Sequence, residues 1–146
     1  MTEPQDNDSR ADILYCYSKQ ILKGRREMKK VLLVDDSISV ARQLEKILAE
    51  SGDFQVVGHG KNGLEAIKMH QSLQPDIICM DMNMPGMDGI TALRTLMSLD
   101  RNVKVVMITS LGGVGDKFNE AIKLGARNVI SKPFEIDNVL RILREL

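Results

Sequence analysis

Five short apolar runs, rich in Val and Ile, recur along the chain and are mostly unbroken by polar residues. Such runs are typical of strands that are covered on both faces, as in a parallel sheet. They start about 23–28 residues apart, which leaves room for a helix and two loops between successive strands. The predicted strands are Val31–Val34, Phe54–Val57, Ile77–Met80, Val105–Ile108 and Asn128–Ile130.

The segments between the runs carry apolar residues at helical spacing, and the first such set is Val40, Leu44, Ile47 and Leu48. Polar and glycine residues mark where these helices begin and end. Asn62, with Glu65 three positions later, resembles a capping box. Asp88 is predicted to cap the third helix, and Gly125 is predicted to stop the fourth.

This alternation predicts an α/β fold, an open doubly wound (βα)₅ parallel sheet, over residues 28–146. Residues 1–27 do not follow the pattern and are expected to form an N-terminal extension, flexible or a short helix. One face of such a helix would carry Ile13, Leu14, Tyr17, Ile21 and Leu22, and a basic linker follows them. In doubly wound folds, ligands bind beyond the carboxyl ends of the strands.

Composition narrows the function classes. The chain has 146 residues and a formal net charge of zero, which argues against a broad electrostatic contact with nucleic acid. No apolar run is long enough for membrane insertion, and the N-terminus lacks the layout of a secretory signal. Cys16 and Cys79 are expected to be free thiols of a cytoplasmic protein. His59 and His70 are expected to be exposed.

Polar residues stand where the predicted strands end, namely Asp35 and Asp36, Asp81, Thr109 and Lys132. In a parallel sheet these ends share one edge, so three carboxylates, a hydroxyl and an ammonium are expected to converge there. Taken singly, each residue has an ordinary structural explanation: an Asp-Asp pair after a strand is often a helix N-cap. The joint arrangement on four strands is much more specific.

Three neighbouring carboxylates repel one another unless they bind protons or a cation. Because the ligands are all oxygen atoms, a hard ion is favoured, Mg²⁺ first and Mn²⁺ as the alternative. Magnesium beside carboxylates points to phosphoryl chemistry. Asp81 is then the candidate nucleophile, which would form an aspartyl phosphate. Lys132 would stabilise the phosphoryl oxygens, and Thr109 would donate a hydrogen bond to one of them.

The stretches VLLVDD, DMNMPGMDG, VVMITS and GARNVISKPF, in this order, resemble the receiver domain of bacterial two-component response regulators. The resemblance runs from about Met28 to the end of the chain. It implies a flavodoxin-like sheet with strand order 2-1-3-4-5. Because the sequence ends with the fifth helix of the pattern, it resembles the stand-alone, CheY-like receivers of chemotaxis, and we expect a receiver of that type.

The resemblance also implies residue roles. Asp81 matches the phosphoacceptor and a metal ligand, and Asp36 matches a direct ligand of Mg²⁺. Asp35 would bind the ion through water, and Asn83 would bind it through its backbone carbonyl. Asn83 and Leu111 would flank the path of the water that attacks the phosphate. Since Leu111 offers no polar group there, slow self-dephosphorylation is expected.

Thr109 and Lys132 match the residues that contact the phosphoryl group, and a cis bond to Pro133 is implied. Two features depart from many receivers. Val129 occupies the position of the usual switch aromatic. The loop after Thr109, SLGGVGDKF, is rich in glycine and is expected to carry more of the conformational change.

The resemblance implies a sensor histidine kinase, CheA-like in chemotaxis, as phosphoryl donor. A downstream protein such as the flagellar motor switch would be the target, and a phosphatase is a further candidate partner. The chain would catalyse only its own phosphorylation and dephosphorylation. An intermediate carrier in a phosphorelay is an alternative. A phosphatase of the haloacid dehalogenase type is disfavoured because Asn83 stands where that type has an acid. A nucleotide-binding module is disfavoured because no glycine fingerprint follows the first strand.

Overall fold

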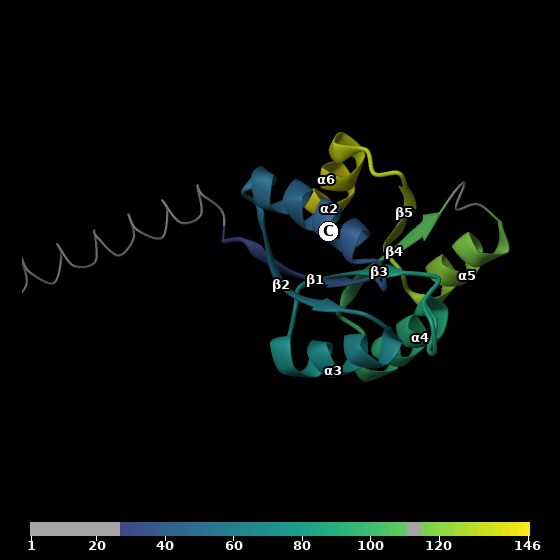
Figure 1. Ribbon diagram of the computed structural model, residues 1–146. Coiled ribbons are helices and arrows are strands. Elements are labelled where there is room, and N and C mark those ends of the chain that lie inside the picture. The colour runs from purple at the N-terminus through teal and green to yellow at the C-terminus, as the bar shows by residue number, and fades with distance from the viewer. Residues whose placement is uncertain (1–26, 111–114) are drawn as a thin grey trace, which may run out of the picture.

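The computed structural model describes residues 27–110 and 115–146. Strands and helices alternate throughout these residues (Figure 1). The strands are β1 Lys29–Val34, β2 Phe54–Gly60, β3 Ile77–Asp81, β4 Lys104–Ser110 and β5 Asn128–Lys132. The helices are α2 Ile38–Ser51, α3 Gly63–Leu73, α4 Gly89–Leu99, α5 Asp116–Leu124 and α6 Ile136–Arg144.

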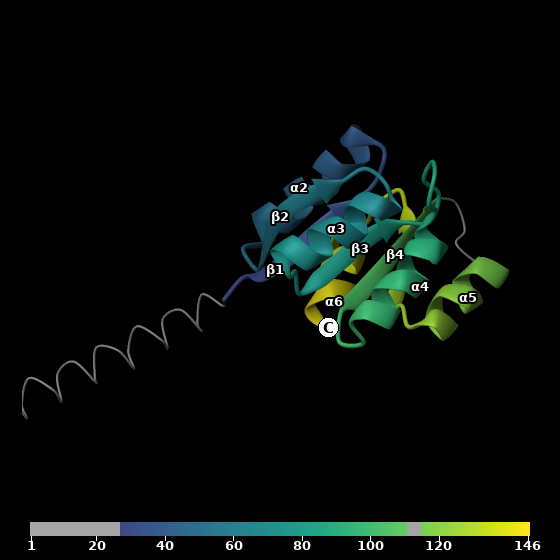
Figure 2. The ribbon, with the colours of Figure 1, turned by 90° about the horizontal axis from the view of Figure 1, so that it is seen from below.

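The five strands form one parallel sheet in the order β2-β1-β3-β4-β5, which confirms the predicted fold class and strand order. Helices α2 and α6 cover one face, and α3, α4 and α5 cover the other (Figures 1 and 2). Successive residues of β1 alternate between the two cores: Val31 and Leu33 pack with α2 and α6, whereas Leu32 and Val34 pack with α3 and α4. Coverage on both faces explains why the strand sequences are unbroken apolar runs.

The predicted helix signals are confirmed. The Asn62 side chain accepts a hydrogen bond from the Glu65 N–H, and the Asp88 side chain accepts one from the Thr91 N–H. Gly125 ends α5 with φ of 115°, a left-handed conformation that costs glycine little. The capping box differs in one detail, because the Glu65 carboxylate accepts from the N–H of Lys61, one residue before the cap.

One expectation about the histidines is wrong. His59 is exposed, as expected, but His70 is only 5% exposed and belongs to the buried face of α3. Its Nε2 lies 3.2 Å from Oδ2 of Asp100, the C-cap residue of α4. The expectation of a free thiol is confirmed for Cys79, which is buried in the core.

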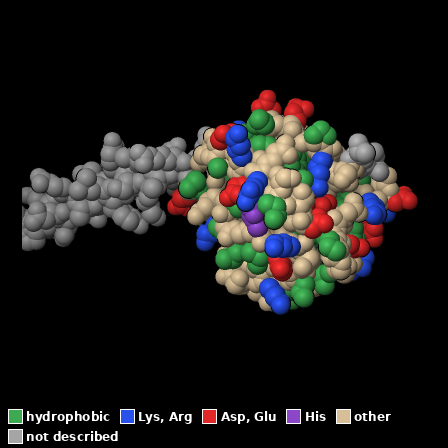
Figure 3. Space-filling view, viewed as in Figure 1, with side chains coloured by type: hydrophobic (Ala, Val, Ile, Leu, Met, Phe, Trp, Pro, Cys, Tyr) green, Lys and Arg blue, Asp and Glu red, His purple; other side chains and the backbone are tan. Residues whose placement is uncertain are grey.

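The described helices include none with the length and apolar character that a membrane crossing requires. On the face seen in Figure 3, Lys and Arg side chains are interspersed with Asp and Glu, so neither sign of charge dominates it. The expectations for the extension, residues 1–26, lie outside the described residues.

Gly89, the first residue of α4, lies against the strand that carries Asp81. A Cβ atom at this position would overlap the backbone carbonyl oxygen of Asp81 and would lie 2.8 Å from Cα of Met82. Its N–H donates to the carbonyl oxygen of Met82 at 3.0 Å. Because two of the three nearest atoms belong to the backbone, which cannot move aside as the end of a side chain can, only glycine lets α4 begin this close to the end of β3.

We expect Gly89→Ala to lower the free energy of unfolding by roughly 1–3 kcal/mol, because the added methyl group must displace backbone. Chemical denaturation measures this. Gly60→Ala is the matched control, since its Cβ would meet Met69 and Val34 side-chain atoms at an ordinary 3.5 Å. Equal effects of the two substitutions would contradict the close approach of α4 to Asp81.

Candidate functional site

The end of β1 supplies two carboxylates with different surroundings. Asp35 is 6% exposed, and its Oδ1 accepts a hydrogen bond of 2.8 Å from the N–H of Ser37. Asp36 is exposed. Neither residue caps α2, because the N-cap is Ser37, whose hydroxyl accepts from the Val40 N–H. The structural explanation for this acidic pair, a helix N-cap, therefore does not hold.

Asp81 is the last residue of β3 and is 4% exposed. The neighbouring strand fixes its position, because Asp81 pairs with Ile108 of β4 and the next N–H, of Met82, donates to the Ile108 carbonyl at 2.9 Å. Asp81 Oδ1 accepts from the N–H of Asn83 at 3.2 Å. Pairing with β4 therefore fixes the backbone of Asp81, and the Asn83 N–H orients its carboxylate.

The carboxyl edge brings the predicted residues together. Asp35, Asp36 and Asp81 each offer a carboxylate oxygen within 4.8 Å of the others. Lys132 Nζ, from the end of β5, lies 3.3 Å from Asp35 Oδ2 and 3.4 Å from Asp81 Oδ2. We call these four residues the carboxyl-edge cluster. Its ammonium bridges two buried carboxylates that originate on different strands.

The balance of charge in the cluster is unfavourable for Asp35. Burial raises the pKa of its carboxyl group above the ordinary value, and the Asp81 carboxylate raises it further. The Ser37 N–H and the Lys132 ammonium act in the opposite direction without reversing the shift. Ionisation of Asp35 therefore costs more free energy in the folded protein than it does in water.

The cluster fits a hard divalent cation. Its donor atoms are all carboxylate oxygens, the ligand type that Mg²⁺ and Mn²⁺ prefer. In addition, Asp35 Oδ2 is buried and makes no hydrogen bond within the described residues, although Lys132 lies within ion-pair distance. A buried carboxylate oxygen without a hydrogen bond is costly, and a cation would satisfy it.

The other predicted residues lie on the same edge. Thr109 is 8% exposed and follows Ile108, the ladder partner of Asp81. The Lys132–Pro133 bond is cis, as the resemblance implies. Val129 is half-buried and packs against the core that α3, α4 and α5 cover. Leu111 and the next three residues of the glycine-rich loop, 112–114, lie outside the described residues.

Sequence reasoning missed two residues that shape this edge, Ser37 and Gly89. A signal for Ser37 is present, because a serine directly precedes the apolar positions of α2, where an N-cap is expected. The tight packing of Gly89 against Asp81 arises from tertiary structure, so no local pattern announces it. The second contact of Lys132, with Asp35, follows in the same way from sheet geometry.

We expect Asp35→Asn to raise the free energy of unfolding of the metal-free protein at pH 7 by about 1 kcal/mol, because it removes a disfavoured buried charge. An asparagine oxygen can still accept from the Ser37 N–H. Since the folded-state pKa of Asp35 is raised, the gain should be smallest where Asp35 is protonated and should grow as the pH rises through that pKa.

Urea denaturation at several pH values, with and without Mg²⁺, measures the effect of Asp35→Asn. Added Mg²⁺ should stabilise the wild type more than the variant. Glu50→Gln, which neutralises an exposed residue of α2, is the control. A stability loss in Asp35→Asn without metal would contradict the charge balance described above.

Comparison with known proteins places this edge in a family. Residues 31–144 match the response regulator receiver domain. The chemotaxis protein CheY of Listeria monocytogenes is 42% identical over 118 residues, which cover 81% of this chain and 98% of that protein.

Two solved structures are similar as well. A chain in the crystal structure of the CheX-CheY-BeF3-Mg+2 complex from Borrelia burgdorferi has 32% identity and a TM-score of 0.73, covering 80% of this chain and 87% of that one. The response regulator domain of Thermotoga maritima CheB has 34% identity and a TM-score of 0.75, covering 82% and 96%. Since the family match spans the entire carboxyl-edge cluster, this chain belongs to the response regulator receiver domain family.

Proposed function

We propose that this chain is a phosphorylation-activated signalling switch of the chemotaxis type, with Asp81 as its phosphoacceptor. A sensor histidine kinase would donate the phosphoryl group. The phosphorylated form would then bind a downstream protein. The assignment to chemotaxis rests on relatives named chemotaxis protein CheY, which align over nearly their whole length.

The observation that carries the proposal is the position of Asp81 between the other acids and Lys132. The Asp81 carboxylate shares the cluster with Asp35 and Asp36, and its Oδ2 lies 3.4 Å from the Lys132 ammonium. A nucleophile for phosphoryl transfer needs positive charge beside the oxygens of the transferred group. Lys132 supplies one such charge, and the carboxylates would bind a divalent cation that supplies a second.

The residues would divide the work as follows. Asp81 and Asp36 would hold Mg²⁺ directly, with the backbone carbonyl of Asn83, and Asp35 would hold it through water. When bound, the ion would offset the repulsion among the acids and the charge of the phosphoryl oxygens. Lys132 would move its ion pair from Asp81 to a phosphoryl oxygen. Thr109 would donate its hydroxyl hydrogen bond to another.

The transfer itself is a displacement at phosphorus. A carboxylate oxygen of Asp81 forms a bond to phosphorus while the bond from phosphorus to the donor's imidazole nitrogen breaks. The imidazole keeps the electron pair of the broken bond, and its nitrogen takes a proton from solvent. The product is an aspartyl phosphate at the end of β3.

The switch would arise from a two-state equilibrium that the phosphate biases. Reorientation of Thr109 would be coupled to β5, where Val129 pairs with Met107 of β4. Val129 packs on the core and has no aromatic ring, so it cannot make the inward rotation expected of the usual switch aromatic. We propose that the readout surface is formed by α5, β5 and α6, and that the glycine-rich loop carries more of the conformational change than it does in many receivers.

The partners follow from the same family. We propose a CheA-like kinase as donor, and a target such as the flagellar motor switch. The CheX-CheY-BeF3-Mg+2 complex is a precedent for a CheY bound to a second protein. We include a phosphatase among the proposed partners because the family resemblance implies one. A phosphorelay carrier and a dehalogenase-type phosphatase are not favoured by the matched family and its chemotaxis relatives.

The direct test is transfer from a phosphorylated CheA-like kinase in the presence of Mg²⁺. Asp81→Asn should abolish transfer, because an amide cannot act as the nucleophile. Asp76→Asn is the control, since Asp76 is an exposed carboxylate at the opposite end of β3. Radiolabelled phosphate on the kinase makes the transfer measurable. Incorporation of this label into Asp81→Asn, or equal loss of incorporation in both variants, would refute the assignment of Asp81.

The lifetime of the phosphate gives a second test. We expect Leu111→Glu to accelerate the decay of the phosphorylated protein, because the resemblance implies that residue 111 flanks the path of the attacking water, which a carboxylate can orient and leucine cannot. Release of inorganic phosphate from purified phosphoprotein measures the decay. Leu111→Met, which keeps an apolar side chain, should leave the rate near that of the wild type. An unchanged rate in Leu111→Glu would contradict the proposed role.

A further inference from the structure

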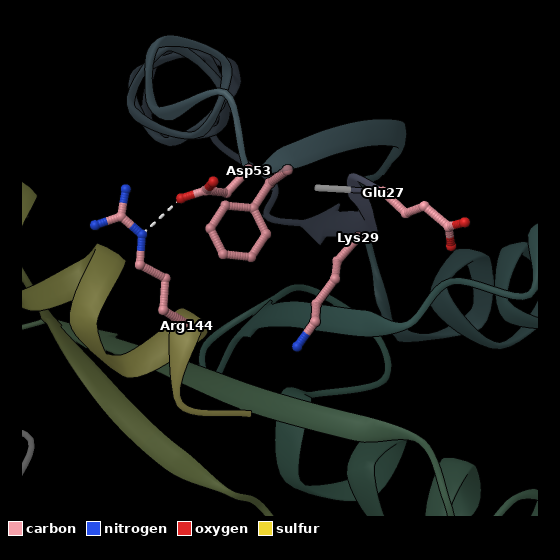
Figure 4. A pocket seen from close by; sticks show the side chains of 5 residues that line it. Glu27, Lys29, Asp53 and Arg144 are labelled. Atoms are coloured by element: carbon pink, nitrogen blue, oxygen red, sulfur yellow. Dashed lines mark hydrogen bonds and ion pairs between the residues drawn. The ribbon is translucent and has the colours of Figure 1, made fainter. Parts of the chain in front are cut away.

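The edge of the sheet opposite the carboxyl-edge cluster contains a pocket with no assigned role. Glu27, Lys29, Asp53, Phe54 and Arg144 line it, and its volume is about 340 Å³ (Figure 4). Lys29 and Phe54 are the first residues of β1 and β2 and pair in the sheet, whereas Arg144 ends α6. We call this the amino-edge pocket. It lies at the far end of the strands from Asp81.

The charged groups around the pocket already make contacts within the fold. Arg144 Nε donates to Asp53 Oδ2 at 2.7 Å, and Lys29 Nζ donates to the carbonyl oxygen of Leu146 at 2.6 Å. Figure 4 shows the Arg144 side chain reaching Asp53, while Glu27 points away from that pair. The lining is mostly apolar, as expected from the Phe54 ring and the stems of Lys29 and Arg144. Its chemistry therefore suits aliphatic side chains better than a small charged ligand.

Glu27 is both a residue of the lining and the point where the upstream segment joins the domain. That segment carries Ile21 and Leu22, six and five residues before Glu27. A chain extends at most about 3.5 Å per residue, so Leu22 always lies within about 18 Å of the Glu27 Cα. Tethering at this range gives an effective concentration on the order of millimolar, which a separate molecule seldom reaches.

We propose that the amino-edge pocket is the docking site of the chain's own N-terminal extension, with Ile21 and Leu22 as the side chains that enter it. A volume of about 340 Å³ accommodates one or two aliphatic side chains, not a whole segment. The basic residues Lys23, Arg25 and Arg26 would then lie close to the carboxylates of Glu27 and Asp53. Docking would place the extension against the last turn of α6, away from the phosphoacceptor.

The cysteines of the chain provide a selective probe. Cys79 is fully buried, and burial raises the pKa of its thiol to about 12, so it is inert toward thiol reagents. A nitroxide can therefore be attached to Cys16 in the full ¹⁵N-labelled chain. We expect loss of amide signal intensity at Lys29, Phe54 and Arg144, without comparable loss at the carboxyl edge.

Variants in the extension separate docking from mere proximity, and they leave the folded domain intact. The double substitution Ile21→Ser and Leu22→Ser, in the same labelled chain, should restore the lost amide signals. The matched control, Lys19→Ser with Gln20→Ser, removes polar residues of the same segment and should keep the loss. Equal signal loss in wild type and in the apolar double variant would overturn the proposal.

A mixed sample distinguishes the extension from a second copy as occupant. It contains ¹⁵N-labelled Cys16→Ser protein and spin-labelled protein without ¹⁵N. We expect no loss of intensity at the pocket amides in this sample. Loss confined to the mixed sample would assign the pocket to another molecule and overturn the intramolecular docking. Phosphorylation of Asp81 plays no part in either measurement.

Discussion

The repulsion among three carboxylates at one sheet edge is the constraint on which the site depends. Asp35 and Asp36 follow β1, and Asp81 ends β3. Because these parallel strands are adjacent, one carboxylate oxygen of each residue lies within 4.8 Å of the others. Lys132 offsets part of this charge through contacts with two of the acids. The remaining imbalance is visible in the raised pKa of Asp35 and makes the edge receptive to a cation. We therefore propose that the metal-free fold gives up some stability at this edge and that a bound cation would restore it.

Much of this arrangement follows from sequence because it needs only the direction of the strands. Once the apolar runs are assigned to a parallel sheet, Asp81, Thr109 and Lys132 must share an edge. Local rules predict the caps at Asn62 and Asp88 because the cap residue and its partner are three positions apart. The roles of the cluster residues in phosphoryl transfer come from the family resemblance and are proposals.

The features that sequence did not supply depend on contacts between distant segments. His70 lies on the same buried face of α3 as Gly63 and Ala66. Its partner, Asp100, is the C-cap of α4, so the contact joins residues 30 positions apart. Gly89 is required by the backbone of β3, and the amino-edge pocket combines residues from positions 27 to 144. No periodicity within one element encodes such contacts. Sequence reasoning therefore brings together the residues of the carboxyl edge, but it does not predict the pocket at the amino edge.

The central claim is that the carboxyl-edge cluster makes one carboxylate, that of Asp81, the acceptor of a phosphoryl group. The most direct measurement is to incubate the protein with acetyl phosphate and Mg²⁺, reduce the acyl phosphate with borohydride, and map the modified residue by peptide mass spectrometry. The account predicts reduction at residue 81 alone, and its disappearance when Mg²⁺ is chelated before phosphorylation. Modification at Asp35 or Asp36 instead, or labelling that is unaffected by chelation, would contradict it.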